Sequence, residues 1–241
     1  MSLYHGQPTT ESYDLLLQEL RNRFPNVPLQ FIQPRKLRGF GKLKNHVPTS
    51  VVSFKDTDKV LEGVESLLKE SHFFFFRSMS VGLALVPMDP LTGKEKPGSL
   101  KTMTHPYPAM LTAVNGDGSK NVAALNSVYD FYNGHFTMKS DQFDYLENTP
   151  ISNFMVAPGA RPDILQLGHN FVDLRTRLTL FGGKDQKITF TLPSTGDFSN
   201  IESVGTTSAD LKKIYVDVVV DGFVIICNNA DIRNYVESQL K

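Results

Sequence analysis

The segment 73–87 constrains the fold more than any other part of the chain. It begins with four consecutive phenylalanines, Phe73 to Phe76, and continues as an alternation of apolar residues with serine, glycine and alanine. Alternation with a period of two is the pattern of a β-strand whose two faces have different surroundings. Four consecutive aromatic side chains must occupy both faces of that strand. We therefore expect either a central strand that is buried on both faces or a strand with one face against a partner.

The segment that precedes this strand favours the first alternative. Residues 57–71 carry apolar side chains at helical spacing, and Thr57 or Asp58 could cap the helix. The apolar positions are Val60, Leu61, Val64, Leu67 and Leu68. We predict a helix over 57–71 that covers the second face of strand 73–87.

Further strands are predicted where short alternating segments lie between turn-forming residues. With the first strand, the segments are 73–87, 99–104, 108–114, 121–126, 135–139, 151–156, 170–182, 186–192 and 213–227. Gly182–Asp185 lies between two of them and predicts a β-hairpin, and Val220–Phe223 predicts a second tight turn. Residues 138–149 are compatible with either a short helix or an irregular loop.

Amphipathic helices are predicted at 9–24, with Thr9 or Thr10 as the cap, and at 229–240, with Asn229 as the cap. The fold class that follows is α+β, with a mainly antiparallel β sandwich or jelly-roll-like body and helices at both ends. We expect a single domain over 1–241. In it, a helical segment 1–71 packs on a β body 72–228, and a C-terminal helix occupies 229–241.

The overall charge is balanced, because the sequence has 25 Lys and Arg residues and 25 Asp and Glu residues. This balance argues against a protein whose whole surface coats nucleic acid. Residues 33–47 differ, since they carry basic residues, two glycines and a phenylalanine but no acid. A flexible basic loop with an aromatic residue is typical of phosphate contacts, although an ordinary solvated loop is the alternative. The candidate residues for contact with nucleic acid or an anionic membrane are Arg35, Lys36, Arg38, Phe40, Lys42 and Lys44.

The sequence has one cysteine, Cys227, which lies in an apolar run. An intramolecular disulfide is therefore excluded, and we expect the thiol to be buried. The first residues lack the charged and apolar regions of a signal peptide, and no apolar run approaches the ~20 residues of a membrane-spanning helix. We expect an intracellular, cytoplasmic protein or a component of a virion.

No linear motif in the sequence points to catalysis. Phosphate-binding glycine loops, the nucleophile elbow and paired-histidine metal motifs are absent, so we predict no catalytic residue, no metal and no cofactor. A catalytic site assembled from separate loops would have no such signature. Its candidates would be His105, His135, Asp141 and His169.

The layout of the chain resembles two groups of viral proteins. The neutral, cysteine-poor β body with turns such as Ala157-Pro158-Gly159 is similar to jelly-roll coat proteins. The succession of 60–68, 73–86, 87–98 and 99–103 resembles the helix, strand, connection and strand of the thirty-kilodalton superfamily of plant-virus movement proteins. In that family the second strand ends in an acidic residue, and Thr102-Met103-Thr104-His105 stand there instead. No site residue is therefore carried over.

These resemblances imply a non-enzymatic viral structural protein of the capsid or matrix type. It would associate with itself through edge strands, loops and terminal helices, while the basic segment 35–44 contacts nucleic acid or a membrane. One alternative is a movement protein that binds single-stranded nucleic acid. The other is a soluble enzyme with a site built from loops.

Overall fold

The computed structural model of the protein describes residues 10–89, 91–99, 101–102, 122–139, 144–154, 171–193, 198 and 212–240. The helices are α1 (Thr10–Arg23), α3 (Val122–Tyr132) and α5 (Ala230–Leu240), with short 3₁₀ turns η1 (Leu29–Phe31), η2 (Asp56–Asp58), η3 (Pro97–Ser99) and η4 (Ile151–Phe154). The strands are β1 (Ile32–Lys42), β2 (Thr49–Ser53), β3 (Phe73–Pro87), β4 (Lys101–Thr102), β5 (His135–Lys139), β6 (Asp144–Pro150), β7 (Val172–Phe181), β8 (Lys187–Thr191) and β9 (Lys212–Ile225).

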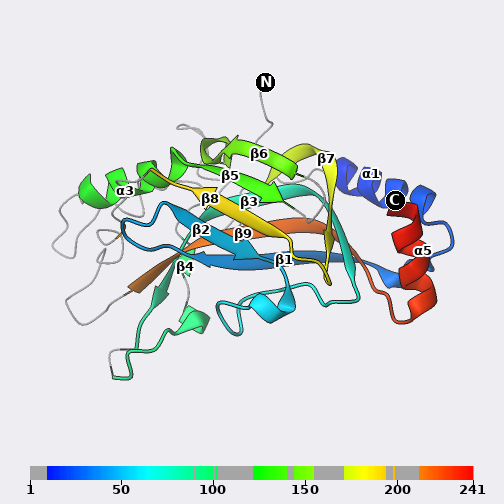
Figure 1. Ribbon diagram of the computed structural model, residues 1–241, viewed down its shortest axis with the longest axis horizontal. Coiled ribbons are helices and arrows are strands. Elements are labelled where there is room, and N and C mark those ends of the chain that lie inside the picture. Colours follow the sequence, from blue (N-terminus) through cyan, green and yellow to red (C-terminus); the bar gives the residue numbers. More distant parts are fainter. Residues whose placement is uncertain are drawn as a thin grey trace.

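The strands form two antiparallel sheets, which lie one above the other in Figure 1. In the first sheet β9 lies between β1 and β3, and the far side of β3 pairs with β7 and, near its end, with β4. The second sheet has the order β2-β8-β5-β6. The prediction of an α+β protein with a mainly antiparallel β body is confirmed.

Strand β3 is buried on both faces, as the first alternative predicted. Phe74 and Phe76 join the large cluster that also contains Phe136 of β5 and Phe190 of β8, so this face packs toward the second sheet. Phe73 and the other phenylalanine on its face pack instead with residues of α1 and α5. Full burial of such a side chain contributes about 1.5–3 kcal/mol, so these phenylalanines are a major source of stability.

A β-bulge at Arg77 shifts the alternation of β3 by one residue. Phe76 lies opposite Gly222 of β9 and Ser78 lies opposite Asp221, so Arg77 has no partner in the register. Before the bulge, even-numbered residues face the second sheet. After it, Met79, Val81, Leu83 and Leu85 do so. The bulge therefore keeps apolar side chains on the core face and places the small polar residues on the other face.

The helix predicted over 57–71 is wrong. Only Asp56–Asp58 forms a 3₁₀ turn, and the following residues are irregular, with Gly63 at a φ of 80°. Apolar residues of the segment are nevertheless buried, and Leu61 packs with Ala84 and Val86 of β3. The second face of β3 is thus covered by α1 and α5 at its start and by this irregular segment at its end.

The hairpin predicted at Gly182–Asp185 is also wrong. Both flanking strands exist, but β7 pairs with β3 in the first sheet, while β8 pairs with β2 and β5 in the second. The turn therefore connects two sheets. Alternation and turn residues predict strands and a reversal of direction, but they do not specify the pairing partner, which the tertiary packing decides here.

Other predicted elements differ in type. Among the described residues, helix α3 takes the place of the strand expected at 121–126, and β6 takes the place of the helix or loop expected at 138–149. The 3₁₀ turn η4 takes the place of the strand expected at 151–156. The tight turn at Val220–Phe223 is absent, because β9 continues straight through it. Of the described residues in the predicted strand 99–104, Lys101–Thr102 form a strand and Ser99 belongs to η3. The predicted strand 108–114 lies outside the described residues.

Several local predictions are confirmed. The ranges of β3 and β5 match, α1 and α5 form close to their predicted limits, and Asn229 Oδ1 accepts a hydrogen bond from the N–H of Ile232 at 2.9 Å. Cys227 is buried as expected. Among the helices that the structure describes, none has the length and apolar character needed to cross a membrane.

Candidate anion-binding site

The basic segment forms a strand, where the sequence predicted a loop. Most of it belongs to β1, which pairs with β9 from Ile32↔Ile225 to Lys42↔Tyr215. The two glycines that suggested flexibility serve close packing, because a Cβ on Gly39 would lie 2.9 Å from the Ser53 carbonyl oxygen, and one on Gly41 would lie 2.8 Å from that of Val51. The segment is therefore held between β9 and β2.

Two of the six predicted contact residues are engaged by acids of β9. Arg38 donates two hydrogen bonds to the Asp217 carboxylate, at 2.9 and 2.6 Å. Lys36 Nζ lies 3.7 Å from Asp221 Oδ2. Burial raises the pKa of Asp221, and the nearby Lys36 opposes this effect. These two positive charges are balanced within the fold, so they contribute little to a net positive surface.

Two further predicted residues, Phe40 and Arg35, also make contacts within the protein. Phe40 is fully buried and packs with Tyr215 in an edge-on contact. An aromatic ring without exposed surface cannot stack on a base, so Phe40 is excluded as a contact residue for nucleic acid. Arg35 Nη2 donates to the carbonyl oxygen of Leu67 at 3.4 Å, which ties its guanidinium to the irregular segment after β2.

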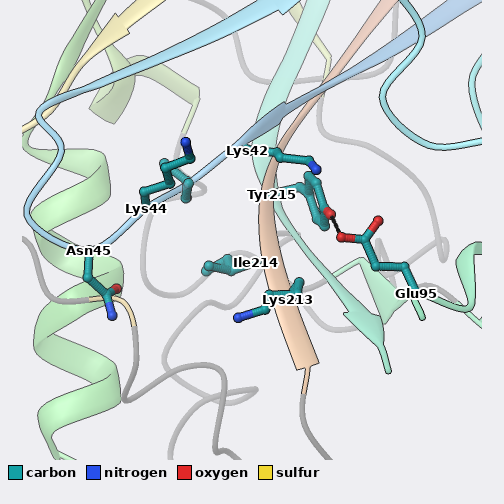
Figure 2. A pocket seen from close by; sticks show the side chains of 8 residues that line it. Lys42, Lys44, Asn45, Glu95, Lys213, Ile214 and Tyr215 are labelled. Atoms are coloured by element: carbon teal, nitrogen blue, oxygen red, sulfur yellow. Dashed lines mark hydrogen bonds between the residues drawn. The ribbon is translucent and has the colours of Figure 1, made fainter. Parts of the chain in front are cut away.

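The remaining two predicted residues, Lys42 and Lys44, line a pocket together with Lys213 of β9. The pocket has a volume of about 350 Å³, and all three lysines are exposed. Figure 2 shows the lysines around Ile214, with two on the chain at and after the end of β1 and the third at the start of β9. The register explains why these residues are neighbours, because the end of β1 lies beside the start of β9.

The base and one side of the pocket are fixed by well-packed residues. Leu43 and Ile214 are buried, and the N–H of Leu43 donates to the Ile214 carbonyl oxygen at 3.3 Å. On the other side the Tyr215 hydroxyl and the Glu95 carboxylate form a hydrogen bond (Figure 2). This bond holds the acid of the pocket against the tyrosine.

Asn45 completes the lining with a hydrogen-bond donor. Its Oδ1 accepts a hydrogen bond from the N–H of Phe198 at 3.0 Å, which leaves the amide NH₂ as the donor group of this side chain. Three ammonium groups and an amide donor around a recess of this size favour an anionic ligand. No group of three or more His, Cys, Asp and Glu side chains suited to a metal occurs among the described residues.

Sequence reasoning found two of the three lysines and missed Lys213, Glu95 and Tyr215. The usable signal was the pair Lys212-Lys213 at the start of the last long strand, but its partner strand could not be known. Of the residues named for an enzyme, His135 lies on β5 and is not among the residues that line the pocket. His105, Asp141 and His169 lie outside the described residues.

Comparison with known proteins gives no information on the function of the pocket. No protein-family model matches the chain, and no curated protein is similar to it.

Proposed function

We propose that this protein is a non-enzymatic jelly-roll protein that assembles with further copies of itself, in the manner of viral coat proteins, inside the cell or in a virion. The observation that carries the proposal is the pairing of the strands. The two sheets would then be the two halves of a β sandwich, with the large apolar cluster between them.

The pairing follows one rule when the eight strands other than β4 are counted in chain order. The first pairs with the eighth, the second with the seventh, the third with the sixth and the fourth with the fifth, that is β1–β9, β2–β8, β3–β7 and β5–β6. These pairs alternate between the first and the second sheet. A long antiparallel hairpin that is rolled up along its length produces this order, which supports a jelly roll.

Jelly rolls occur in viral capsids, in lectins and in cupins, so the topology alone leaves several functions open. A coat-type role is favoured here by a projecting arm, residues 88–89 and 91–96, which extends beyond the end of β3 in Figure 1. A bridge between Met88 and Glu95 and a hydrogen bond from Lys96 N to Pro87 O at 2.8 Å hold the arm together. Leu91 at its tip is 94% exposed. An apolar side chain at the tip of an ordered arm is suited to insertion into a neighbouring molecule.

One of the two edge strands of the second sheet, β6, is less suited to self-association. Strand β6 has two register irregularities against β5, a positive φ at Asn148, an exposed Glu147 and Pro150 at its end. Bulges, charges and proline are the features that protect an edge strand from pairing with another chain. Of β6 and the arm, we assign the contact between copies to the arm.

The test is the mass of the purified protein, measured by light scattering across a wide range of concentrations at low and high salt. We expect discrete or open-ended assemblies that grow with concentration. The variant Leu91→Asp should remain smaller than wild type at the same concentration. The matched control is Leu29→Asp, which adds the same charge at another exposed leucine and should assemble normally.

A wild-type protein that is monomeric under all of these conditions would contradict the proposed function. Equal assembly of wild type and the Leu91→Asp variant would be consistent with self-association. It would exclude the arm as the contact between copies.

A further inference from the structure

We propose that the pocket formed by Lys42, Lys44 and Lys213 binds phosphate groups of single-stranded nucleic acid. This inference does not depend on self-association, because all three lysines belong to the same molecule. It replaces the surface expected from the sequence with a smaller one, which contains two of the predicted residues and one from the opposite end of the chain.

The first support is the balance of charge at the pocket. Three lysines and one acid, Glu95, are among its lining residues. Neither Lys42 nor Lys44 forms an ion pair with an acid of the described part of the chain, in contrast to Lys36 and Arg38. Their positive charge is therefore available to an external anion, and the attraction is stronger in a recess than on an open surface.

The second support is the way in which Glu95 is held. Its carboxylate accepts a hydrogen bond from the hydroxyl of Tyr215, and the tyrosine is only 1% exposed. In Figure 2 this pair lies on the same side of the pocket as Lys42, and Lys44 and Asn45 lie on the opposite side. A phosphate can therefore approach Lys44 from the side away from the acid.

The third support is the size and shape of the site. A volume of about 350 Å³ is at the lower end of small-ligand pockets and is sufficient for a nucleotide-sized group. Leu43 and Ile214 are the apolar residues of the lining, and both are buried. Asn45 adds a hydrogen-bond donor beside the lysines.

The shape of the recess also distinguishes between the candidate polyanions, namely a membrane surface, a duplex and a single strand. A membrane surface is broad and contacts convex, protruding residues, whereas these lysines surround a hollow. A duplex holds its phosphates on a stiff backbone, while a single strand can bend one phosphate into a recess. Single-stranded nucleic acid is therefore the ligand that fits the geometry.

The experiment measures binding of a fluorescent single-stranded oligonucleotide by anisotropy as a function of salt. The pocket variant is Lys42→Gln, Lys44→Gln and Lys213→Gln combined. The control variant is Lys59→Gln, Lys69→Gln and Lys187→Gln combined, which removes three exposed lysines outside the pocket. We expect the pocket variant to bind at least about tenfold more weakly at low salt, with a log–log salt slope smaller by about 2.

The control variant should bind like wild type, and both variants should keep the thermal unfolding and the assembly of wild type. Equal losses in the two variants would overturn the proposal, because they would show a diffuse charge effect. Absence of oligonucleotide binding by wild type would also overturn it. Binding to vesicles that contain phosphatidylserine is measured in parallel. Retention of the protein on these vesicles without oligonucleotide binding would identify a membrane site instead.

Discussion

Arg38 and Asp217 form an ion pair with two hydrogen bonds across β1 and β9, and the Asp217 side chain has no exposed surface. Charges of this kind are costly to bury unless both partners are present. The pair is also next to Phe40, over which the Arg38 guanidinium lies at 4.9 Å from the ring centre. Arg38, which the sequence suggested as a ligand contact, therefore neutralises the charge of the buried Asp217.

We predict that Arg38→Met destabilises the protein by about 3–5 kcal/mol, because it leaves the Asp217 carboxylate buried without its cation. The double variant Arg38→Met/Asp217→Leu should recover a large part of this loss. Urea denaturation provides the measurement. Lys36→Met is the control, since Lys36 is 60% exposed and its ion pair with Asp221 should contribute at most about 1 kcal/mol. Equal effects of the two single variants would contradict the buried-pair interpretation.

Gly222→Ala should be severely destabilising. The glycine lies opposite Phe76 at the bulge, and an added Cβ would lie 2.0 Å from the Phe75 carbonyl oxygen and 2.9 Å from the Phe76 Cα. Strands β9 and β3 would have to separate, so we expect a loss of about 2–4 kcal/mol or failure to fold. Gly98→Ala is the matched control, because no atom lies within 4 Å of its added Cβ. Thermal unfolding of the two variants checks the prediction, and a stable Gly222→Ala protein would contradict the bulge register.

Glu65 organises the irregular segment after η2. One of its carboxylate oxygens accepts hydrogen bonds from the N–H groups of Val60 and Leu61 at 2.7 and 2.8 Å, and the other accepts from the N–H of Phe40 at 3.2 Å. Glu65→Ala removes these acceptors, so we expect a loss of about 1–3 kcal/mol in urea denaturation. Val122→Ala, at an exposed position, should be nearly neutral by comparison.

The pH dependence of the Glu65 variant has a definite sign. Burial raises the pKa of Glu65 above its usual value. Glu65 therefore binds a proton more readily in the folded state than in the unfolded chain. The contribution of Glu65 to the free energy of unfolding declines as pH rises through its raised pKa. The difference in free energy of unfolding between wild type and Glu65→Ala should be larger at pH 4 than at pH 7. An opposite trend would show that the charged carboxylate is the stabilising form.

Cys227 should be unreactive in the folded protein. It is 5% exposed, and burial raises its pKa to about 11, so the thiol is neutral at pH 8. Because the thiolate is the nucleophile, we expect labelling by a thiol reagent to be slow under native conditions and rapid in denaturant. Stoichiometric labelling within the mixing time of the native protein would contradict the buried environment.

The sequence by itself determined the long strand 73–87 and the need for apolar surroundings on both of its faces. The four phenylalanines required apolar surroundings on two sides, and the structure provides them with the second sheet on one side and α1 and α5 on the other. The limits of β3 and β5, the terminal helices and the burial of Cys227 also followed from local patterns. These features depend on periodicity and capping within a few residues of one another, which a sequence records directly.

Only the tertiary structure decided which strands pair and where the lysines meet. The turn at 182–185 has the residues of a hairpin, yet β7 and β8 lie in different sheets. Residues 57–71 have helical spacing, yet they follow an irregular path in which the Glu65 carboxylate accepts the N–H of Val60, Gly63 has a positive φ and Leu61 is buried. Lys42 and Lys213 come together because β1 and β9 pair over a long distance in sequence. Side-chain periodicity specifies one face of a segment, and the packing of the whole chain selects its neighbour.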